Sequence, residues 1–161
     1  MWWRLTSKDF TAQKGEGNRN ALKQLVDSGV ATGILAYSSG EPIGWCSVAP
    51  RTSFPRLARS RVLKQINGQP VWSVVCFLVA KQFRRKGVTV ALLKAAGDFA
   101  GKHGAAILEG YPLETRSGRI ADSFAYTGLV SAFRKAGFVE VLRRSQTRPI
   151  MRYIISDTPN R

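Results

Sequence analysis

The strongest constraint on this chain is a strand–helix–strand pattern near its centre. The segment Val71–Val79 reads VWSVVCFLV and is apolar at nearly every position, as in a strand buried on both faces. It is followed by Val88–His103, where apolar residues recur at helical spacing before Gly104. Ala105–Tyr111 is again a short, apolar, strand-like segment. Two strands joined by a helix in this way lie parallel with a right-handed crossover.

The segments on either side of this unit predict antiparallel strands and further helices. Ile34–Tyr37 and Ile43–Val48 flank a polar turn and predict a hairpin, and Phe138–Leu142 and Ile150–Ile155 predict a second strand pair. The other predictions are a short strand at Met1–Leu5, helices over Asn18–Asp27 and Gly128–Ala136 (the latter with Thr127 as N-cap), a short helix near Leu57–Leu63, and a loop over Pro112–Ser123.

Together these elements predict an α/β fold. We expect a single domain over residues 1–161, with a mixed, mostly antiparallel sheet around a central parallel strand–helix–strand unit and with flanking helices. Met1–Leu5 is brief for an opening strand, so the first strand is expected to be incomplete.

The composition excludes several classes of protein and favours anionic partners. No run of about 18 apolar residues is present and no export signal is recognisable, so we expect a cytoplasmic protein with no membrane partner. One histidine and two cysteines in apolar segments suggest neither a metal site nor a disulfide framework. The formal net charge is +15, and the stretch Pro42–Gly97 contains no acidic residue. Such a field attracts polyanions, although a solvated basic surface without a dedicated partner is the alternative.

The loop between the central strand and its helix has the chemistry of a phosphate site. Arg84, Arg85 and Lys86 precede Gly87 at the point where the helix begins. A helix N-terminus carries unpaired N–H groups and a partial positive charge, and three cations there oppose the dipole unless an anion is bound. Glycine lets the backbone approach a phosphate closely. The sequence therefore predicts a diphosphate at this loop.

Residues Cys76–Ala91, CFLVAKQFRRKGVTVA, resemble the acetyl-CoA motif of the GNAT superfamily of N-acyltransferases. That motif is an apolar strand, a short loop, and then Arg/Gln-x-x-Gly-x-Gly/Ala at a helix start. It falls here on Arg84, Gly87 and Thr89, of which Thr89 departs from the usual small residue. The segment from Phe133 to Phe138 is similar to the Tyr-x-x-x-Gly-Phe that ends the family's last helix.

The resemblance implies that acetyl-CoA, or another acyl-CoA, is the co-substrate. The backbone amides of Arg85–Thr89 would hold the pyrophosphate, and the strand residues before the loop would pair with the pantetheine arm as if it were another strand. The implied cofactor-binding residues are Phe77, Leu78, Val79, Arg84, Arg85, Lys86, Gly87, Val88 and Thr89.

The resemblance also implies direct transfer, in which an amine attacks the thioester carbonyl while a backbone N–H of Leu78 or Val79 polarises its oxygen. The tyrosine that commonly protonates the leaving thiolate falls on Phe133, which has no hydroxyl. Three interpretations remain. Tyr126 or Tyr111 donates the proton, the thiolate leaves unassisted, or the protein binds acyl-CoA without turnover.

Glu109 is the one carboxylate of its strand, and it is either the general base or a solvent-facing residue. The amine acceptor is unknown, and the basic field favours an acidic or nucleic-acid-associated one. A homodimer would be usual for the family. The alternatives to an enzyme are an acyl-CoA-binding domain without catalysis and a basic nucleic-acid-binding module.

Overall fold

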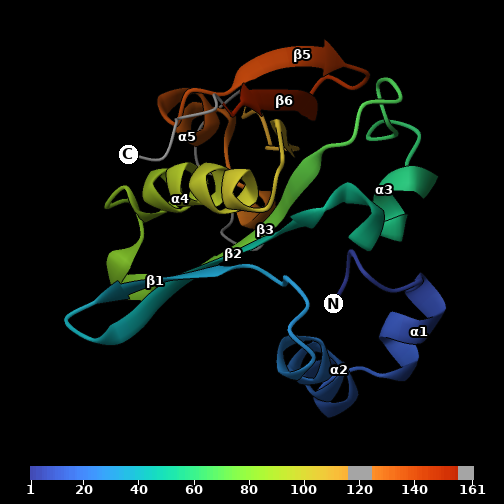
Figure 1. The fold of residues 1–161 in the computed structure, drawn as a ribbon, viewed down its shortest axis with the longest axis vertical. Coiled ribbons are helices and arrows are strands. Elements are labelled where there is room, and N and C mark those ends of the chain that lie inside the picture. The colour runs from blue at the N-terminus through green and yellow to red at the C-terminus, as the bar shows by residue number, and fades with distance from the viewer. Residues whose placement is uncertain (116–124, 156–161) are drawn as a thin grey trace.

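The hairpin, the central unit and the last strand pair join into one mixed sheet. The computed structural model describes residues 1–115 and 125–155, and within these residues it forms a six-stranded sheet with the order β1-β2-β3-β4-β6-β5 (Figure 1). Each neighbouring pair in this sheet is antiparallel except β3 and β4, which are parallel. The strands are β1 Ile34–Ser38, β2 Glu41–Pro50, β3 Trp72–Val79, β4 Ile107–Gly110, β5 Val139–Arg143 and β6 Pro149–Ile154. The predicted α/β class, the mixed sheet and the central parallel unit are thereby confirmed.

Helices cover both faces of the sheet. The helices are α1 Ser7–Ala12, α2 Glu16–Asp27, α3 Pro55–Arg59, α4 Val88–Lys102 and α5 Val130–Lys135, with short 3₁₀ helices η1 Arg51–Ser53, η2 Lys81–Phe83 and η3 Ala125–Thr127. Figure 1 shows α4 and α5 on one side of β2 and β3, and α1, α2 and α3 on the other. No helix within the described ranges is long and apolar enough to cross a membrane.

The buried residues form two clusters, one with α4 and α5 and one with the segment around α3. The first cluster contains Val74 and Phe77 of β3 with Leu92 of α4, and the second contains Val75 of β3 with Leu57 of α3. The apolar face of α4 packs on β1, β2 and β3, as its helical spacing requires. The sheet is therefore the middle layer, with a core on each side.

A β-bulge separates β3 from β4. The parallel pairing runs only from Trp72–Leu108 to Val74–Gly110. On the other side of β3, Ser47 is opposite Cys76 while Val48 is opposite Val74, so Val75 is an extra residue in β3. A bulge bends its strand and increases the local twist. Residues 75–79 therefore lose β4 as a neighbour and, among the described residues, have no strand partner on that side.

Several local predictions are wrong. Met1–Leu5 forms a turn rather than a strand, and the chain then enters α1, whose N-cap Thr6 accepts a hydrogen bond from Asp9 N. The short helix begins at Pro55, because the fixed φ of proline suits the first turn of a helix.

Three further predictions differ in detail. The N-cap of α5 is Leu129 rather than Thr127, which belongs to η3. Leu78 is 65% exposed, so the end of β3 is not buried on both faces. The predicted loop over Pro112–Ser123 lies outside the described residues from position 116 onward.

Gly110 allows the ring of Phe133 to pack at the end of β4. A Cβ atom on Gly110 would lie 2.1 Å from Phe133 Cε1. We predict that Gly110→Ala lowers the free energy of unfolding by about 1–3 kcal/mol, the usual cost of overpacking a core. Urea titration measures this change. Gly68→Ala is the control, since nothing lies within 4 Å of that added Cβ, and an equal loss in both variants would contradict the packing explanation.

Candidate functional site

A large cleft lies along the free edge of β3. Its volume is about 870 Å³, within the range of small-molecule sites. Its walls come from the end of β3, the loop that enters α4, the first turn of α4, and the region from η3 through α5. The lining residues are Phe77, Leu78, Val79, Phe83, Arg84, Arg85, Gly87, Val88, Thr89, Val90, Thr115, Ala125, Tyr126, Gly128, Leu129, Ser131, Ala132 and Lys135. The bulge thus opens the sheet at the point where the loop begins.

The direction of the backbone along β3 decides which amide faces this cleft. Ala80 N donates to the Ile43 carbonyl of β2, and successive residues of a strand point their polar groups to opposite sides. Leu78 therefore turns its N–H toward β2, as Ala80 does. Val79 faces the other way, and its carbonyl accepts a hydrogen bond from Arg84 Nε at 3.1 Å. This geometry favours Val79 over Leu78 as the amide on the cleft, whereas Leu78 contributes its exposed side chain.

The loop before α4 has the backbone of an anion site. Gly87, the N-cap of α4, has φ +81°, and Arg85 has φ +60°. Left-handed residues at a helix start turn successive N–H groups toward one side, where an anion can accept them. No side chain caps the α4 N-terminus, so within the described structure its first N–H groups are left for a ligand. An added Cβ on Gly87 would meet nothing within 4 Å.

Nearly all residues predicted to hold the cofactor line this cleft. The exception is Lys86, whose Nζ lies 5.6 Å from the centre of the Phe83 ring. Ser131 and Lys135 line the opposite wall and were not among the predicted residues. These two residues are four apart and therefore share one face of α5. That spacing was visible in the sequence, but nothing in the sequence said which face of α5 the cleft would meet.

Tyr126 is a wall residue of two cavities. It lines both the large cleft and a second cavity of about 300 Å³ on the other side of β3. Its phenol is half-buried, and this burial raises its pKa, although the nearby Arg148 opposes the effect. A raised pKa keeps the hydroxyl protonated at neutral pH. Of the two tyrosines predicted as proton donors, Tyr126 is the one on the cleft.

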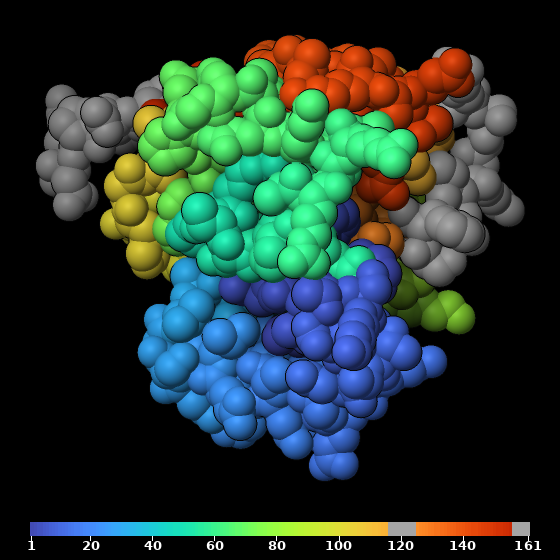
Figure 2. Space-filling view, turned by 90° about the vertical axis from the view of Figure 1, so that its right-hand side faces the viewer, coloured from blue at the N-terminus to red at the C-terminus, as the bar shows by residue number. Residues whose placement is uncertain are grey.

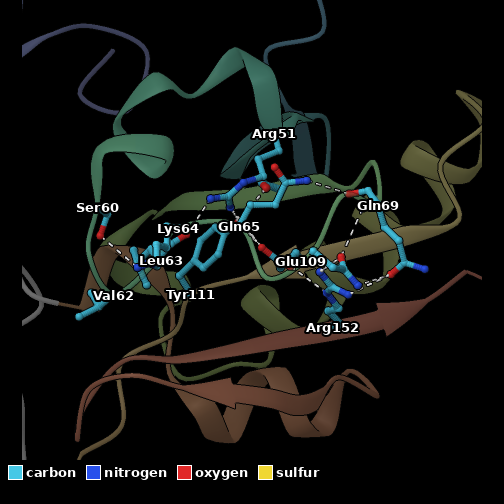
Figure 3. A network of polar contacts seen from close by, with 12 residues as sticks. Arg51, Ser60, Val62, Leu63, Lys64, Gln65, Gln69, Glu109, Tyr111 and Arg152 are labelled. Atoms are coloured by element: carbon cyan, nitrogen blue, oxygen red, sulfur yellow. Dashed lines mark hydrogen bonds and ion pairs between the residues drawn. The ribbon is translucent and has the colours of Figure 1, made fainter.

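Glu109 and Tyr111 lie instead in a buried polar network (Figure 3). Arg152 Nε donates to Glu109 Oε2 at 2.8 Å, and Arg51 Nη1 donates to Glu109 Oε1 at 3.2 Å. The Tyr111 hydroxyl also donates to Oε1, at 2.8 Å, and lies 2.9 Å from Ser73 Oγ. Glu109 is only 1% exposed, so the expectation of a solvent-facing carboxylate is wrong.

The polar groups of Glu109 and Tyr111, the two residues predicted as catalytic candidates, are occupied by this network. Neither Glu109 nor Tyr111 lines the large cleft, and burial raises the pKa of Tyr111 far above its ordinary value. Arg51 Nη2 also donates to the Leu63 carbonyl, and Arg152 reaches Gln69. The geometry gives these residues a structural task, which is to fasten the segment between β2 and β3 to β4 and β6.

Phe133 does not reach the cleft. Its ring is fully buried and packs edge-on against Phe77 and Phe138, between Gly110 and Gly128. The phenylalanine thus fills the core at the position where the resemblance implied a tyrosine.

The sequence matches the family described as the acetyltransferase (GNAT) family over residues 1–118, which is most of the chain. The protein belongs to the GNAT acetyltransferase family. No curated protein matches its sequence. Within the described residues, no three His, Cys, Asp or Glu side chains gather as a metal site.

Solved structures of this family share the fold. A GNAT-family protein from Desulfovibrio desulfuricans is 15% identical, with a TM-score of 0.55 and coverage of 86% of this chain and 79% of its own. A GNAT-family acetyltransferase from Streptococcus pneumoniae is 15% identical, with a TM-score of 0.54 and coverage of 88% and 78%. Ard1 from Thermoplasma volcanium is 15% identical, with a TM-score of 0.52 and coverage of 96% of both chains. These likenesses support the fold and leave the acceptor open.

The network around Glu109 makes a testable contribution to stability. Glu109→Gln removes the negative charge between two buried arginines, and breaking a buried ion pair costs about 3–5 kcal/mol. We predict a loss of this size in urea unfolding. Glu140→Gln is the control, because Glu140 pairs with Arg143 near the surface, where an ion pair contributes less than about 1 kcal/mol. Equal losses in the two variants would contradict the buried-network interpretation.

Proposed function

We propose that this protein is an acetyl-CoA-dependent N-acetyltransferase that moves the acetyl group directly to an amine. The observation that carries the proposal is the continuity of one cleft. It joins the free backbone edge of β3 to the anion-binding start of α4. Coenzyme A has the matching layout, with an amide-rich arm on one side of a diphosphate.

The charges of the cleft suit the diphosphate. Arg84, Arg85 and Lys135 line it, and no acidic residue does so among the described residues. The N–H groups at the start of α4 would donate hydrogen bonds to the phosphate oxygens, and Arg85 and Lys135 would add Coulomb attraction from opposite walls. The backbone of Phe77 and Val79 would pair with the pantetheine amides, because these residues have no strand partner on that side among the described residues.

We assign a separate role to each residue that would lie near the thioester. Val79 N–H would stabilise the negative charge that develops on the thioester oxygen, as a preorganised backbone donor does. Tyr126 would give its proton to the departing thiolate, since its hydroxyl stays protonated at neutral pH. The amine would lose its proton to water, because Glu109 is buried in its ion pairs. Acyl-CoA binding without turnover is the second candidate, and Phe133 is the observation behind it.

The cofactor site is tested at Gly87. We predict that Gly87→Glu lowers the affinity for acetyl-CoA about 100-fold or more, because it places a negative charge where the diphosphate should lie. Isothermal titration calorimetry with acetyl-CoA measures the change.

Gly104→Glu is the matched control at the other end of α4. Gly104 has φ +79°, against +81° for Gly87, and each added Cβ would meet open space. The two glutamate substitutions therefore cause similar backbone strain, but only the one at Gly87 lies in the cleft. Equal losses of affinity in the two variants, or no binding of acetyl-CoA by the folded wild type, would overturn the proposed function. Steeply salt-dependent binding of DNA or RNA would then favour the nucleic-acid-binding alternative.

The proton donor is tested by a pair of tyrosine variants. Tyr126→Phe is predicted to lower kcat about 100-fold without changing the KM for acetyl-CoA, a typical loss for a proton-transfer group. Because burial raises the pKa of Tyr126, the wild-type kcat should fall only at a pH above the ordinary pKa of tyrosine, and the variant should lack this alkaline limb. Tyr111→Phe is the control, expected to lose stability and keep kcat. An unchanged kcat in Tyr126→Phe would mean that the thiolate leaves unassisted.

A further inference from the structure

The second cavity is walled by aromatic rings. It lies on the face of the sheet opposite α4, between the N-terminal region and the strands β2 and β3. Its aromatic lining residues are Trp2, Trp3, Phe10, Trp45, Phe54 and Tyr126. In Figure 2 the N-terminal region, in blue, fills the lower half of the view and abuts the green segment between β2 and β3. The cavity is thus assembled from parts of the chain that lie far apart in the sequence.

The bulge in β3 lies between this cavity and the cleft. Val75 and Cys76, the residues at the bulge, line the aromatic cavity, and Phe77 begins the lining of the cleft. Tyr126 belongs to both linings. The aromatic cavity and the cleft are therefore neighbours on either side of Tyr126, the proposed proton donor. The Cys76 thiol is no rival nucleophile there, because burial raises its pKa.

The charge of this cavity disfavours one large class of amines. Among the described residues, no carboxylate residue lines it, whereas Arg4 does. The guanidinium of Arg4 lies 4.8 Å from the centre of the Phe54 ring and donates to the Ala31 carbonyl. A polyamine or an aminoglycoside would bring several positive charges beside a cation, with no acidic partner in the wall. Like charges placed together disfavour such an acceptor.

One polar group in the wall lacks a partner. The indole Nε1–H of Trp3 is buried and makes no hydrogen bond within the described structure. An unmade hydrogen bond of this kind is costly, and an acceptor brought within reach of this N–H would remove that cost. Together with Arg4, this donor suits a carbonyl or carboxylate oxygen. The walls of indole and phenyl rings suit a flat apolar body beside that oxygen.

We propose that the acceptor is an aromatic α-amine, meaning a primary amine whose α-carbon carries an aromatic side chain and a carbonyl or carboxylate. This inference rests on the proposed function and names its substrate class. Both a free aromatic amino acid and a peptide whose first residue is aromatic have this combination of amine, aromatic side chain and oxygen acceptor. In the reaction, the neutral amine nitrogen bonds to the acetyl carbon and the C–S bond breaks. The thiolate of coenzyme A takes one proton, and the amine nitrogen releases one.

An acceptor panel tests the class directly. The release of the coenzyme A thiol is followed with acetyl-CoA and each of five probes: phenylalanine, phenylalanine amide, the dipeptide Phe-Gly, spermidine and kanamycin. We expect at least one of the three phenylalanine compounds to exceed both polycations about tenfold or more in kcat/KM. A preference for phenylalanine would assign a free amino acid, and a preference for Phe-Gly would assign a peptide N-terminus.

A matched pair of tryptophan variants tests whether the acceptor binds in the aromatic cavity. Trp45 and Trp72 are half-buried residues of neighbouring strands, and Trp45 lines the aromatic cavity, whereas Trp72 packs against Phe99 of α4. Trp45→Leu is expected to raise the KM of the preferred acceptor about tenfold or more and to leave acetyl-CoA affinity unchanged. Trp72→Leu should leave both unchanged.

The possible results separate this inference from the proposed function. If calorimetry shows acetyl-CoA binding but the polycations are the better acceptors, or none of the phenylalanine compounds is acetylated, the substrate class is overturned and the cofactor site stands. An equal effect of Trp45→Leu and Trp72→Leu on the KM would also overturn it. If the folded wild type binds no acetyl-CoA, the proposed function and this inference both fail.

Discussion

The parting of β3 from β4 is the constraint on which the rest of the site depends. A continuous parallel pair would satisfy the backbone of β3 on both sides and leave no edge for a ligand. The extra residue at Val75 bends the strand after the Val74–Gly110 pair. Polar backbone groups that lose a strand partner need another one. The cleft, the exposed Leu78 and the inward-facing Val79 all follow from that bend.

The buried network keeps the two sides of the opening in place. Glu109 on β4 holds Arg51, which begins the segment that returns to β3, and Arg152 on β6. The charged groups of Glu109, Arg51 and Arg152 are buried, and their hydrogen bonds go to one another and to Tyr111. Glu109 and Tyr111 are buried and do not line the cleft, so two residues that the sequence offers as catalytic candidates contribute instead to this network.

The two cavities that share Tyr126 as a wall residue have different chemistry. The cleft combines cationic side chains with the start of a helix, which suits phosphates. The cavity across β3 combines aromatic rings with one guanidinium, which suits a flat body with an oxygen acceptor. Three of the basic residues, Arg84, Arg85 and Lys135, line the cleft, so this part of the net charge of +15 needs no nucleic-acid partner to explain it.

The sequence by itself determined the elements whose causes are local. The apolar run of β3, the helical spacing of α4 and the cations before Gly87 depend on neighbours within a few residues, so they predicted the central unit and the phosphate loop. Only the tertiary structure decided what depends on distant pairing. It placed Glu109 between two arginines more than 40 residues away on either side, as the hydrogen bonds show. It also set the register that turns Val79 rather than Leu78 toward the cleft. Burial, strand register and cavity walls all depend on contacts between segments that are remote in the sequence, and no local pattern encodes them.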